Sequence, residues 1–435
     1  MEIPRLTELI DLAIKHGSIN WFAGSRPTAD SPFTGFGDRL FLNGHSYPTY
    51  HAYGYGGAGI SLSQGVADQV IRDFDRNHLD KRGNVLVIGA GIVGLSIARA
   101  LIQAGYQQLT MLSAFYPPGS GSLPEAFSPV SKENYYPSCV GGGYIMPVKF
   151  GTKLHSRQTR SIIENSQHGW EALGKNPSYS AMIRKGSRIS LLPVDPRKVK
   201  SYRYDAMAIN QLLGYELYPI EIHEQPLTGF TINDQPFKRT AHSIIEIHNT
   251  LMIDPVSIQQ QFIKELSDSR RVSFLQEVIH SPESLQKHLS PGQTIVNASG
   301  TGMGSIFGVS ETTPVRGDLI VATIPLKSLS FVKNISSDHH SFYTPGMTFH
   351  MRFNSHTMTV VLGGTNLTGV ASTEFSQASI RHILKHWYAF AHCPDNCHNQ
   401  DKNSLISLNN NKYVSCCLES NAFVERVIDS FPDNI

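Results

Sequence analysis

The spacing of hydrophobic residues near the start of the chain predicts a helix, short strands and a second helix. Residues 5–16 carry apolar side chains three and four positions apart, as on one face of a helix, and residues 60–74 repeat this spacing. Ile19 to Ala23 predicts a short strand, and Leu40 to Leu42 predicts another. The glycine, proline and serine residues within 28–39 predict a turn-rich loop between these strands.

The segment after residue 83 predicts a strand, a helix and a second strand, which is the opening of a βαβ unit. Val85 to Ile88 is a continuous apolar run, a helix follows as far as Ala104, and Leu109 to Leu112 predicts the next strand. The rest of the chain mixes helices with short strands. Its predicted elements are helices over residues 156–173, 254–266 and 376–390, antiparallel strands within 185–250, and strands over 272–275, 294–296, 319–324 and 357–362.

The composition is that of a globular protein without a strong electrostatic partner. The 435 residues are 40% hydrophobic and 17% charged, and this length predicts two domains. A formal net charge of +2 gives no reason to expect nucleic acid or a membrane surface as a partner. The chain has no apolar run of about 20 residues, and its first residues lack the apolar centre of a signal peptide. We therefore expect a cytoplasmic protein.

The five cysteines indicate neither a disulfide framework nor a metal site. Their odd number and uneven spacing fit a reducing compartment. Cys393 and Cys397 stand beside His392 and His398, but this spacing differs from that of a zinc pair, and no second pair is evident. We expect no bound metal.

A glycine-rich turn follows the strand at residues 85–88 and has the pattern of a dinucleotide site. Gly89 permits a tight turn, Gly91 lets the backbone approach a pyrophosphate, and Gly94 lets the helix pack closely on the strand. The helix that begins near Ile92 presents free N–H groups and a partial positive charge to the phosphates. The turn alone does not choose between FAD and NAD.

The second strand of this unit lacks a feature that such sites usually have. An acidic residue commonly ends that strand and binds the adenosine ribose, but Ser113, Ala114 and Phe115 follow Leu112 here. Ser113 is the residue left to make a weaker hydrogen bond to the ribose.

Two segments further along carry a second small-residue turn and an arginine–glycine motif. Thr294 to Gly302 has the sequence TIVNASGTG, and Pro314 to Asp318 has the sequence PVRGD. The first is similar to the second FAD-proximal strand of the D-amino-acid oxidase and glycine oxidase family of FAD-dependent oxidoreductases. The second resembles the segment that leads into that family's substrate domain. The resemblance implies FAD as the cofactor, with contacts from Ser299 and Gly300 and a backbone contact from Ile279 to the adenine.

Two segments near the N-terminus resemble motifs that the family carries near its C-terminus. His51 to Leu62, with the sequence HAYGYGGAGISL, resembles the run that closes over the flavin ring. Trp21 to Pro27, with the sequence WFAGSRP, resembles the family's GxRP strand. Both precede the glycine-rich turn, and no second copy follows residue 365. The order is that of a circular permutant, with completion of a neighbouring subunit's site by residues 1–75 as the alternative.

The fold implied by the resemblance is α/β, with a Rossmann-like FAD-binding domain and a second, mostly antiparallel-sheet α+β substrate domain. Residues 19–150 and 254–312 are assigned to the FAD-binding domain, and residues 151–253 and 313–392 to the substrate domain. Residues 19–75 would then be the family's C-terminal segment moved to the N-terminus. Residues 393–435 remain without an assignment.

The family's flavin and substrate contacts fall on a small set of residues. The helix after Gly59 would direct its N-terminus at the flavin pyrimidine, where the N–H groups of Ile60 and Ser61 would stabilise the negative charge of the reduced ring. The Gly57 carbonyl would accept a hydrogen bond from the substrate amine. The other flavin contacts implied are Gly56, Gly143 and Tyr144.

Arg26, within the GxRP-like motif, is the candidate for the substrate carboxylate, because its planar fork suits a bidentate grip. Arg352 is a rival for that role. The corresponding region of the family pocket places Tyr343, Phe349 and His350 over the substrate.

The activity implied by the resemblance is FAD-dependent oxidation of an amine or amino acid. Hydride passes from the carbon next to nitrogen to the flavin, the product is an imine, and dioxygen accepts the electrons to give hydrogen peroxide. One alternative is a specialised secondary amine or natural-product intermediate as substrate, and another is a non-catalytic flavin-binding protein. A nicotinamide dehydrogenase would not need the flavin-closing segment. Self-association into a homo-oligomer is left open.

Overall fold

The structure is a computed structural model that describes most of the chain. The described residues are 2–3, 6–16, 19–116, 137–147, 157–193, 206–223, 231–232, 235–236, 242–302, 306–307, 312–329, 339–344, 347–353, 356–363, 365–372, 374, 376–392 and 411–431. The helices expected around residues 5–16, 60–74, 92–104, 156–173, 254–266 and 376–390 are confirmed.

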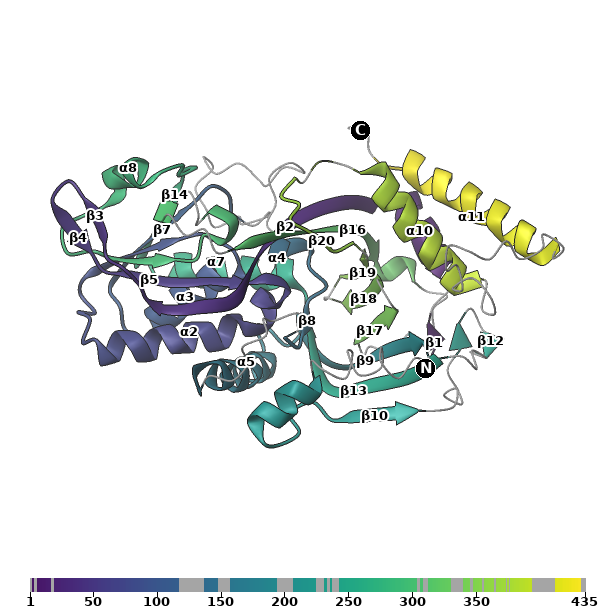
Figure 1. Cartoon of the computed structure of the whole chain (residues 1–435), viewed down its shortest axis with the longest axis horizontal. Helices are drawn as coiled ribbons and strands as arrows, with labels where there is room; N and C mark the ends of the chain where they lie inside the picture. Colours follow the sequence, from purple (N-terminus) through teal and green to yellow (C-terminus); the bar gives the residue numbers. More distant parts are fainter. Residues whose placement is uncertain are drawn as a thin grey trace.

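One mixed sheet of 15 strands runs through the molecule and joins two halves (Figure 1). Its strands lie in the order β10-β13-β9-β17-β18-β19-β16-β2-β5-β15-β6-β7-β14, with β8 beside β13 and β20 beside β16. The strands from β5 to β14 form a parallel half, and those from β10 to β16 form a mostly antiparallel half. The fold is therefore α/β, as the sequence predicts.

The parallel half is a sheet buried on both faces. Val85 and Val87 of β6 point into the core that its helices form, while Leu86 and Ile88 point into a second cluster on the other face. Such two-sided burial explains the continuous apolar run of this strand. Its strands are β5 (Thr49–Tyr55), β15 (Thr294–Asn297), β6 (Asn84–Ile88), β7 (Gln108–Ser113) and β14 (Val272–Gln276).

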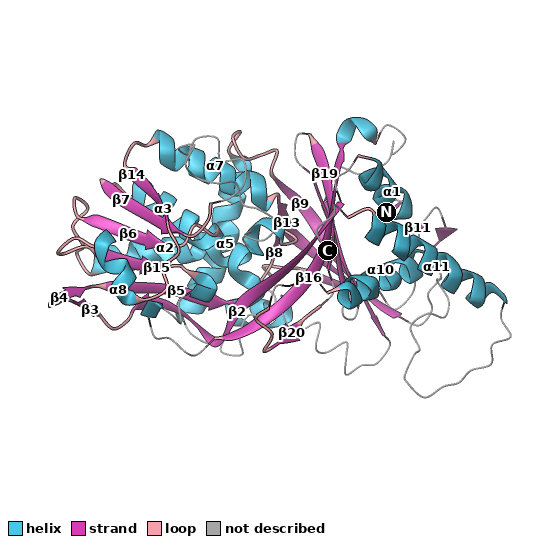
Figure 2. Ribbon diagram, turned by 90° about the horizontal axis from the view of Figure 1, so that it is seen from above, coloured by secondary structure: helices cyan, strands magenta, loops and turns pink. Residues whose placement is uncertain are grey.

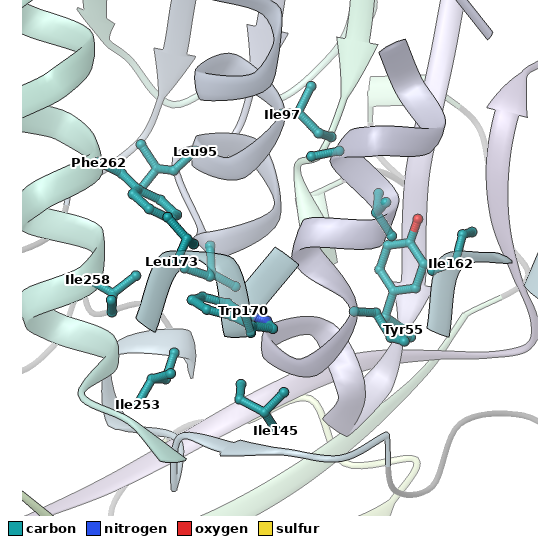
Figure 3. Packing of buried hydrophobic residues seen from close by; sticks show 14 of the residues in the cluster. Tyr55, Leu95, Ile97, Ile145, Ile162, Trp170, Leu173, Ile253, Ile258 and Phe262 are labelled. Carbon is teal, nitrogen blue, oxygen red and sulfur yellow. The ribbon is translucent and has the colours of Figure 1, made fainter. Parts of the chain in front are cut away.

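Several helices share the larger core of this half. Among the described residues they include α2 (Gly59–Arg76), α3 (Ile92–Gln103), α5 (Arg157–Lys175), α7 (Pro255–Asp268) and the helix over residues 206–213. Figure 3 shows Trp170 of α5 and Phe262 of α7 in this core, near Leu95 of α3. Helices α2 and α5 approach so closely that a Cβ on Gly65 would lie 1.9 Å from the Ile162 carbonyl oxygen.

The antiparallel half has one face covered by helices and one polar face. The covered face packs against α1 (Leu6–Lys15), α10 (Gln377–His392) and α11 (Asn411–Asp429), as Figure 2 shows. Its side chains, such as Ile189, Met351 and Val360, are apolar and buried. The strands of this half are β9 (Ile183–Pro193), β10 (Ile220–His223), β13 (His242–Ile253), β16 (Thr313–Pro325), β17 (His339–Thr344), β18 (Met347–Phe353) and β19 (Thr357–Gly363).

The long strand β2 (Ile19–Phe36) joins the two halves. Its first part, from Ile19 to Thr28, pairs with β16, and its second part pairs with β5 through Phe33 to Phe36. The loop predicted over residues 28–39 is therefore wrong for residues 28–36. Pairing with the edge of β5 holds this segment extended, and Pro32 falls where the register is irregular, between Thr28 and Phe33.

The C-terminal segment left unassigned from the sequence contains a helix that packs on two others. Arg381 of α10 forms an ion pair with Glu425 of α11 through Nη2 and Oε2 at 2.8 Å. Arg426 of α11 lies 2.6 Å from an Asp11 oxygen of α1. Helix α11 thus completes the cover of the apolar sheet face.

The remaining elements are short. They are β1 (Glu2–Ile3), β3 (Leu40–Leu42), β4 (His45–Tyr47), α4 (Pro137–Val140), β8 (Tyr144–Ile145), β11 (Thr231–Ile232), β12 (Gln235–Pro236), α8 (Pro282–Leu285), β20 (Leu367–Thr368), and 3₁₀ turns at Gly56–Ala58, Gln286–His288, Gly300–Gly302 and Leu326–Ser328. Across the described ranges, no helix is long and apolar enough to cross a membrane.

Candidate active site

The carboxyl ends of three parallel strands bring three small-residue turns to one edge of the sheet. The turns follow β5 at Gly56, β6 at Gly89 and β15 at Ala298. In open α/β sheets, ligands bind outside the carboxyl ends of the strands. This edge is therefore where the expected cofactor contacts converge.

The turn after β6 needs its glycines for backbone packing. Gly89 has a φ of +101°, and a Cβ there would lie 2.4 Å from the Ala298 carbonyl oxygen. A Cβ on Gly94 would lie 1.9 Å from the Gly89 carbonyl oxygen, so α3 packs directly on the turn. A side chain at 89 would force the turn away from the residues after β15, and a side chain at 94 would force α3 away from the turn.

The N-terminus of α3 has the features of an anion-binding site. Gly91 is its N-cap and carries no capping side chain, and the Ile92 N–H donates only a long hydrogen bond of 3.4 Å to Ser138 Oγ. The first-turn N–H groups of a helix carry a partial positive charge that favours phosphate. The Ser113 hydroxyl accepts a hydrogen bond from the Ala90 N–H at 3.1 Å, so Ser113 also supports the glycine turn.

A second helix N-terminus, that of α2, lies next to the segment containing β8. Ala58 is its N-cap and makes no side-chain capping bond. The Ser61 hydroxyl lies 3.1 Å from both the Tyr144 and Met146 carbonyl oxygens, which ties α2 to β8. The indole of Trp170 donates to the Ile60 carbonyl at 3.3 Å. The start of α2 is thus held in place from two sides.

The turn before α2 is fixed against β2. Gly56 has a φ of +53°, and a Cβ there would lie 2.9 Å from Thr28 Oγ1. Thr28 is two residues beyond Arg26 on the same strand. The glycine run and Arg26 are therefore positioned by one strand.

Residues Gly142 to Tyr144 contact β13 and β18 of the antiparallel half and α2 of the parallel half. Gly143 has a φ of +75°, and the Ile253 N–H of β13 donates to its carbonyl at 2.8 Å. A Cβ on Gly142 would lie 2.2 Å from the His350 ring. The Tyr144 ring lies nearly parallel to that of His350, with centroids 6.4 Å apart.

His350 belongs to a row of polar residues on the polar face of the antiparallel half. In the strand register Arg188 of β9 stands opposite Ser341 of β17, and Ser341 stands opposite His350 of β18. Arg352 is two residues beyond His350 and therefore shares its face. Arg188, Ser341, His350 and Arg352 are all buried, and we call these four residues the arginine–histidine cluster.

The charges in this cluster are strongly influenced by burial. Burial lowers the pKa of His350 to about 3, and the neighbouring Arg188 and Arg352 lower it as well. His350 is thus neutral at physiological pH. Burial also lowers the pKa of Arg352, while Asp254 opposes that effect, and Arg352 donates to the Gly141 carbonyl at 2.6 Å.

Arg26 reaches the same face of the sheet from β2. It stands opposite Val315 of β16, and the alternation of residues along β16 places Val315 on the side away from the helix-covered core. Its guanidinium lies 3.2 Å from Asn366 Oδ1 and close to Gly317, and burial lowers its pKa. A Cβ on Gly317 would lie 3.1 Å from Arg26 Nη2, so a larger residue at 317 would require the guanidinium to shift slightly.

Phe349 does not join the other expected substrate residues. Its ring packs against Trp387 of α10 with centroids 5.4 Å apart, in the core under the covered face. Neighbouring residues in a strand point to opposite faces, so His350 and Phe349 cannot both line the polar face. Tyr343 does lie with the cluster, since its ring is 5.2 Å from the Arg188 guanidinium.

Two further expected cofactor contacts lie at the same sheet edge. The Ser299 hydroxyl donates to Asn297 Oδ1 at 2.7 Å, and Gly300 has a φ of +61° with open space around it. The Glu277 N–H donates to the Ser113 carbonyl at 3.0 Å, which brings the segment containing Ile279 beside the end of β7. Sequence reasoning missed Arg188, although its alternation with Ile189 indicates that it lies on the polar face.

The cysteine and histidine residues at 393–398 lie outside the described residues. Within the described ranges, one group of three potential metal ligands comes together, Glu221, Glu246 and His248, on β10 and β13. Exposed acidic groups gather in this way without a metal, and we assign none here.

Comparisons with solved structures find chains of low identity. Glycine oxidase from Bacillus cereus ATCC 14579 is 12% identical, with a TM-score of 0.47, over 71% of this chain and 77% of that chain. L-proline dehydrogenase from P. horikoshii is 13% identical, with a TM-score of 0.46, over 72% of this chain and 78% of that chain. L-amino acid deaminase from Proteus vulgaris is 14% identical, with a TM-score of 0.39, over 65% of this chain and 61% of that chain. No curated protein sequence matches this chain.

A family model gives the decisive comparison. The model described as FAD dependent oxidoreductase (DAO) matches residues 84–396, which is more than half of the chain and includes the glycine-rich turn after β6, β15 and most of the antiparallel half. The chain belongs to the DAO family of FAD-dependent oxidoreductases, whose members bind FAD.

Proposed function

We propose that this protein uses FAD to oxidise an amine or amino acid at the carbon next to nitrogen. The observation that carries the proposal is the convergence of Arg26, the glycine run before α2 and the Gly142 to Tyr144 segment. When bound, FAD would supply the acceptor for one hydride, which carries both electrons of the oxidation, and dioxygen would then take up these two electrons with two protons to give hydrogen peroxide. The imine product would hydrolyse in water.

The residues that would hold FAD fall into three groups, for the pyrophosphate, the flavin and the adenosine. Gly89, Gly91, Ile92 and Gly94 would receive the pyrophosphate at the start of α3. The flavin ring would lie by the start of α2 and β8, and the adenosine by the ends of β7 and β15. The residues proposed for these contacts are Gly56, Gly57, Gly59, Ile60, Ser61, Gly143 and Tyr144 for the flavin, and Ser113, Ile279, Ser299 and Gly300 for the remainder.

The chain's own groups would then bind and orient the substrate. Arg26 would hold the carboxylate, and the Gly57 carbonyl would accept a hydrogen bond from the amine. The N–H groups of Ile60 and Ser61 would stabilise negative charge at the start of α2. A neutral His350 would offer one ring nitrogen as a donor and the other as an acceptor.

The substrate class is tested by spectroscopy of the purified protein. We expect flavin absorbance bands, and anaerobic mixing with D-amino acids, glycine, sarcosine and other secondary amines should bleach the bands with at least one compound. Admission of air should then restore the bands and release hydrogen peroxide. A protein that cannot be reconstituted with FAD would refute the proposal. Bleaching without peroxide release would replace the oxidase assignment by a dehydrogenase.

Gly89→Ala should abolish FAD binding. The added Cβ would collide with the Ala298 backbone and strain a turn with positive φ, so the pyrophosphate site would be displaced. The measurement is the flavin content of the purified variant and its fluorescence titration with FAD. Gly44→Ala is the matched control, because Gly44 also has a positive φ (+77°) but has open space around it. Equal FAD content in the two variants would contradict this role of Gly89.

Arg26→Met should retain FAD and lose activity on carboxylate substrates. Truncating one partner of a buried charged pair costs about 2–5 kcal/mol, so kcat/KM should fall by roughly 30-fold to several thousand-fold. The matched control is Arg39→Met, since Arg39 is exposed on the β3–β4 hairpin. Turnover of an amine that lacks a carboxylate should change little. Unchanged kcat/KM with an amino acid would remove Arg26 from the substrate site.

We also propose that the chain is a circular permutant of the family. Strands β2 and β5 and helix α2 precede β6 in the chain, yet β5 lies beside β15 in the parallel half, and the family match begins at residue 84. Residues 19–75 would complete the site of their own chain. Domain limits of 19–150 with 254–312, and 151–253 with 313–392, are part of this proposal.

A rearranged gene tests the permutation. A chain that begins at residue 84, continues to 431 and is joined by a flexible linker to residues 1–76 keeps α1 on the covered face, and it should fold and bind FAD with an affinity close to that of the natural order. The same chain without residues 19–76 should not bind FAD, because β5 is lost from the sheet. Failure of the rearranged chain to bind FAD would count against the permutation.

A further inference from the structure

Arg188 is a buried cation without a protein counter-charge in the part of the chain that the structure describes. Its side chain is 8% exposed, and Nε has no hydrogen-bond partner. Its contacts are two aromatic rings, with Tyr144 at 5.3 Å and Tyr343 at 5.2 Å from the guanidinium carbon. These rings hold the guanidinium in place, but they leave the Nε donor for another group.

The neighbours of Arg188 on this face of the sheet are also unsatisfied. Ser341 Oγ, His350 Nδ1 and Arg352 Nε are buried and have no partner among the described residues. Three of these four unpaired polar atoms lie in one register row, from Arg188 across Ser341 to His350, and Arg352 lies two residues further along β18 on the same face. Such a group is unusual, because buried polar groups are nearly always hydrogen-bonded. All four can donate a hydrogen bond once His350 takes the tautomer with a proton on Nδ1.

The charges around this row are predominantly positive. Arg188 and Arg352 both act on His350, while Asp254 is the acidic side chain that acts on Arg352. Cys139 is the other titratable group there, and it lies beside Gln259. Asp254 acts on Arg352 but no carboxylate of the described residues is paired with Arg188, so the two buried guanidiniums leave an excess of positive charge. Burial of such a charge is unfavourable unless an anion pairs with it.

We propose that the arginine–histidine cluster binds a second carboxylate of the substrate, so that the preferred substrate is an amino acid or amine with two acidic groups. Arg26 binds one carboxylate, and Arg188 and Ser341 bind the other. This inference rests on the proposed function, because it names the substrate class of the same site. It accounts for a row of buried donors that a substrate with one carboxylate would leave unpaired.

Binding of unreactive acids tests the inference without turnover. Glutarate and butyrate have similar carbon chains and differ by one carboxylate, and their affinities for the FAD-loaded protein can be measured by calorimetry. Glutarate should bind about tenfold to a hundredfold more tightly, as expected for hydrogen bonds to a charged group. Arg188→Met should reduce that difference to about threefold or less, with butyrate affinity nearly unchanged.

Two further variants separate binding from folding. Ser341→Ala removes one hydroxyl that has no partner, so it should fold normally and weaken glutarate binding severalfold. Arg39→Met should leave the difference between glutarate and butyrate unchanged. Arg188→Met without ligand should melt at a temperature equal to or above that of the parent, because an apolar side chain replaces an unpaired buried charge.

The results distinguish this inference from the proposed function. Equal affinity of the parent protein for both acids, or an unchanged difference in Arg188→Met, would overturn the dicarboxylate inference while leaving amine oxidation intact. Loss of FAD from Arg188→Met with the difference retained would assign Arg188 to the cofactor and likewise overturn it. If no amine or amino acid reduces the flavin but glutarate is still preferred, the proposed oxidation fails and the anion site stands.

Discussion

The molecule depends on one strand that pairs with both halves of the sheet. Strand β2 uses its first ten residues to pair with β16 and its last four to pair with β5. Backbone pairing over this length fixes the antiparallel half relative to the parallel half far more tightly than side-chain contacts alone would. Arg26 and the Gly56 turn sit on either side of the crossing at Thr28. The distance between the carboxylate-binding candidate and the start of α2 is therefore set by a continuous backbone.

The elements that the sequence predicts well are those whose causes are local. The turn from β6 into α3 needs Gly89 and Gly94 because the backbone of β15 and of the turn itself occupies the space of a side chain. That requirement is visible in the sequence as a spacing of glycines after an apolar run. Helix α2 is visible for the same reason, since its apolar stripe repeats within a few residues. The order of the strands is not local, and the predicted loop over residues 28–36 fails because β5 supplies its partner from 20 residues away.

The face on which a strand residue lies is a harder problem than the existence of the strand. A resemblance that places residues 343–350 near the substrate includes Phe349 and His350 alike, yet one packs against Trp387 and the other against Gly142. Moving by one residue along the strand, from Phe349 to His350, changes the environment from the helix-covered core to the buried polar face of the sheet. Arg188 shows the opposite failure. From the sequence alone, an arginine in a strand is expected to be exposed to solvent. Arg188 is buried because β9 pairs with β17, and β17 with β18, so that the side chains of these strands surround it.

Burial disfavours the positive charges of the proposed site, and binding of an anionic ligand would offset that cost. The starts of α2 and α3, Arg26, Arg188 and Arg352 all present positive charge or N–H donors to the region between the two halves. The net charge of +2 gives no indication of this local positive field. The field comes from a few cationic groups buried close together, and the net charge counts all charged residues of the chain alike. Because His350 is neutral, it adds no third positive charge to the arginine–histidine cluster. A protein that holds a buried cation such as Arg188 without a counter-charge among the described residues should be less stable empty than occupied, so the proposed anionic cofactor and substrate groups would both stabilise the fold that binds them.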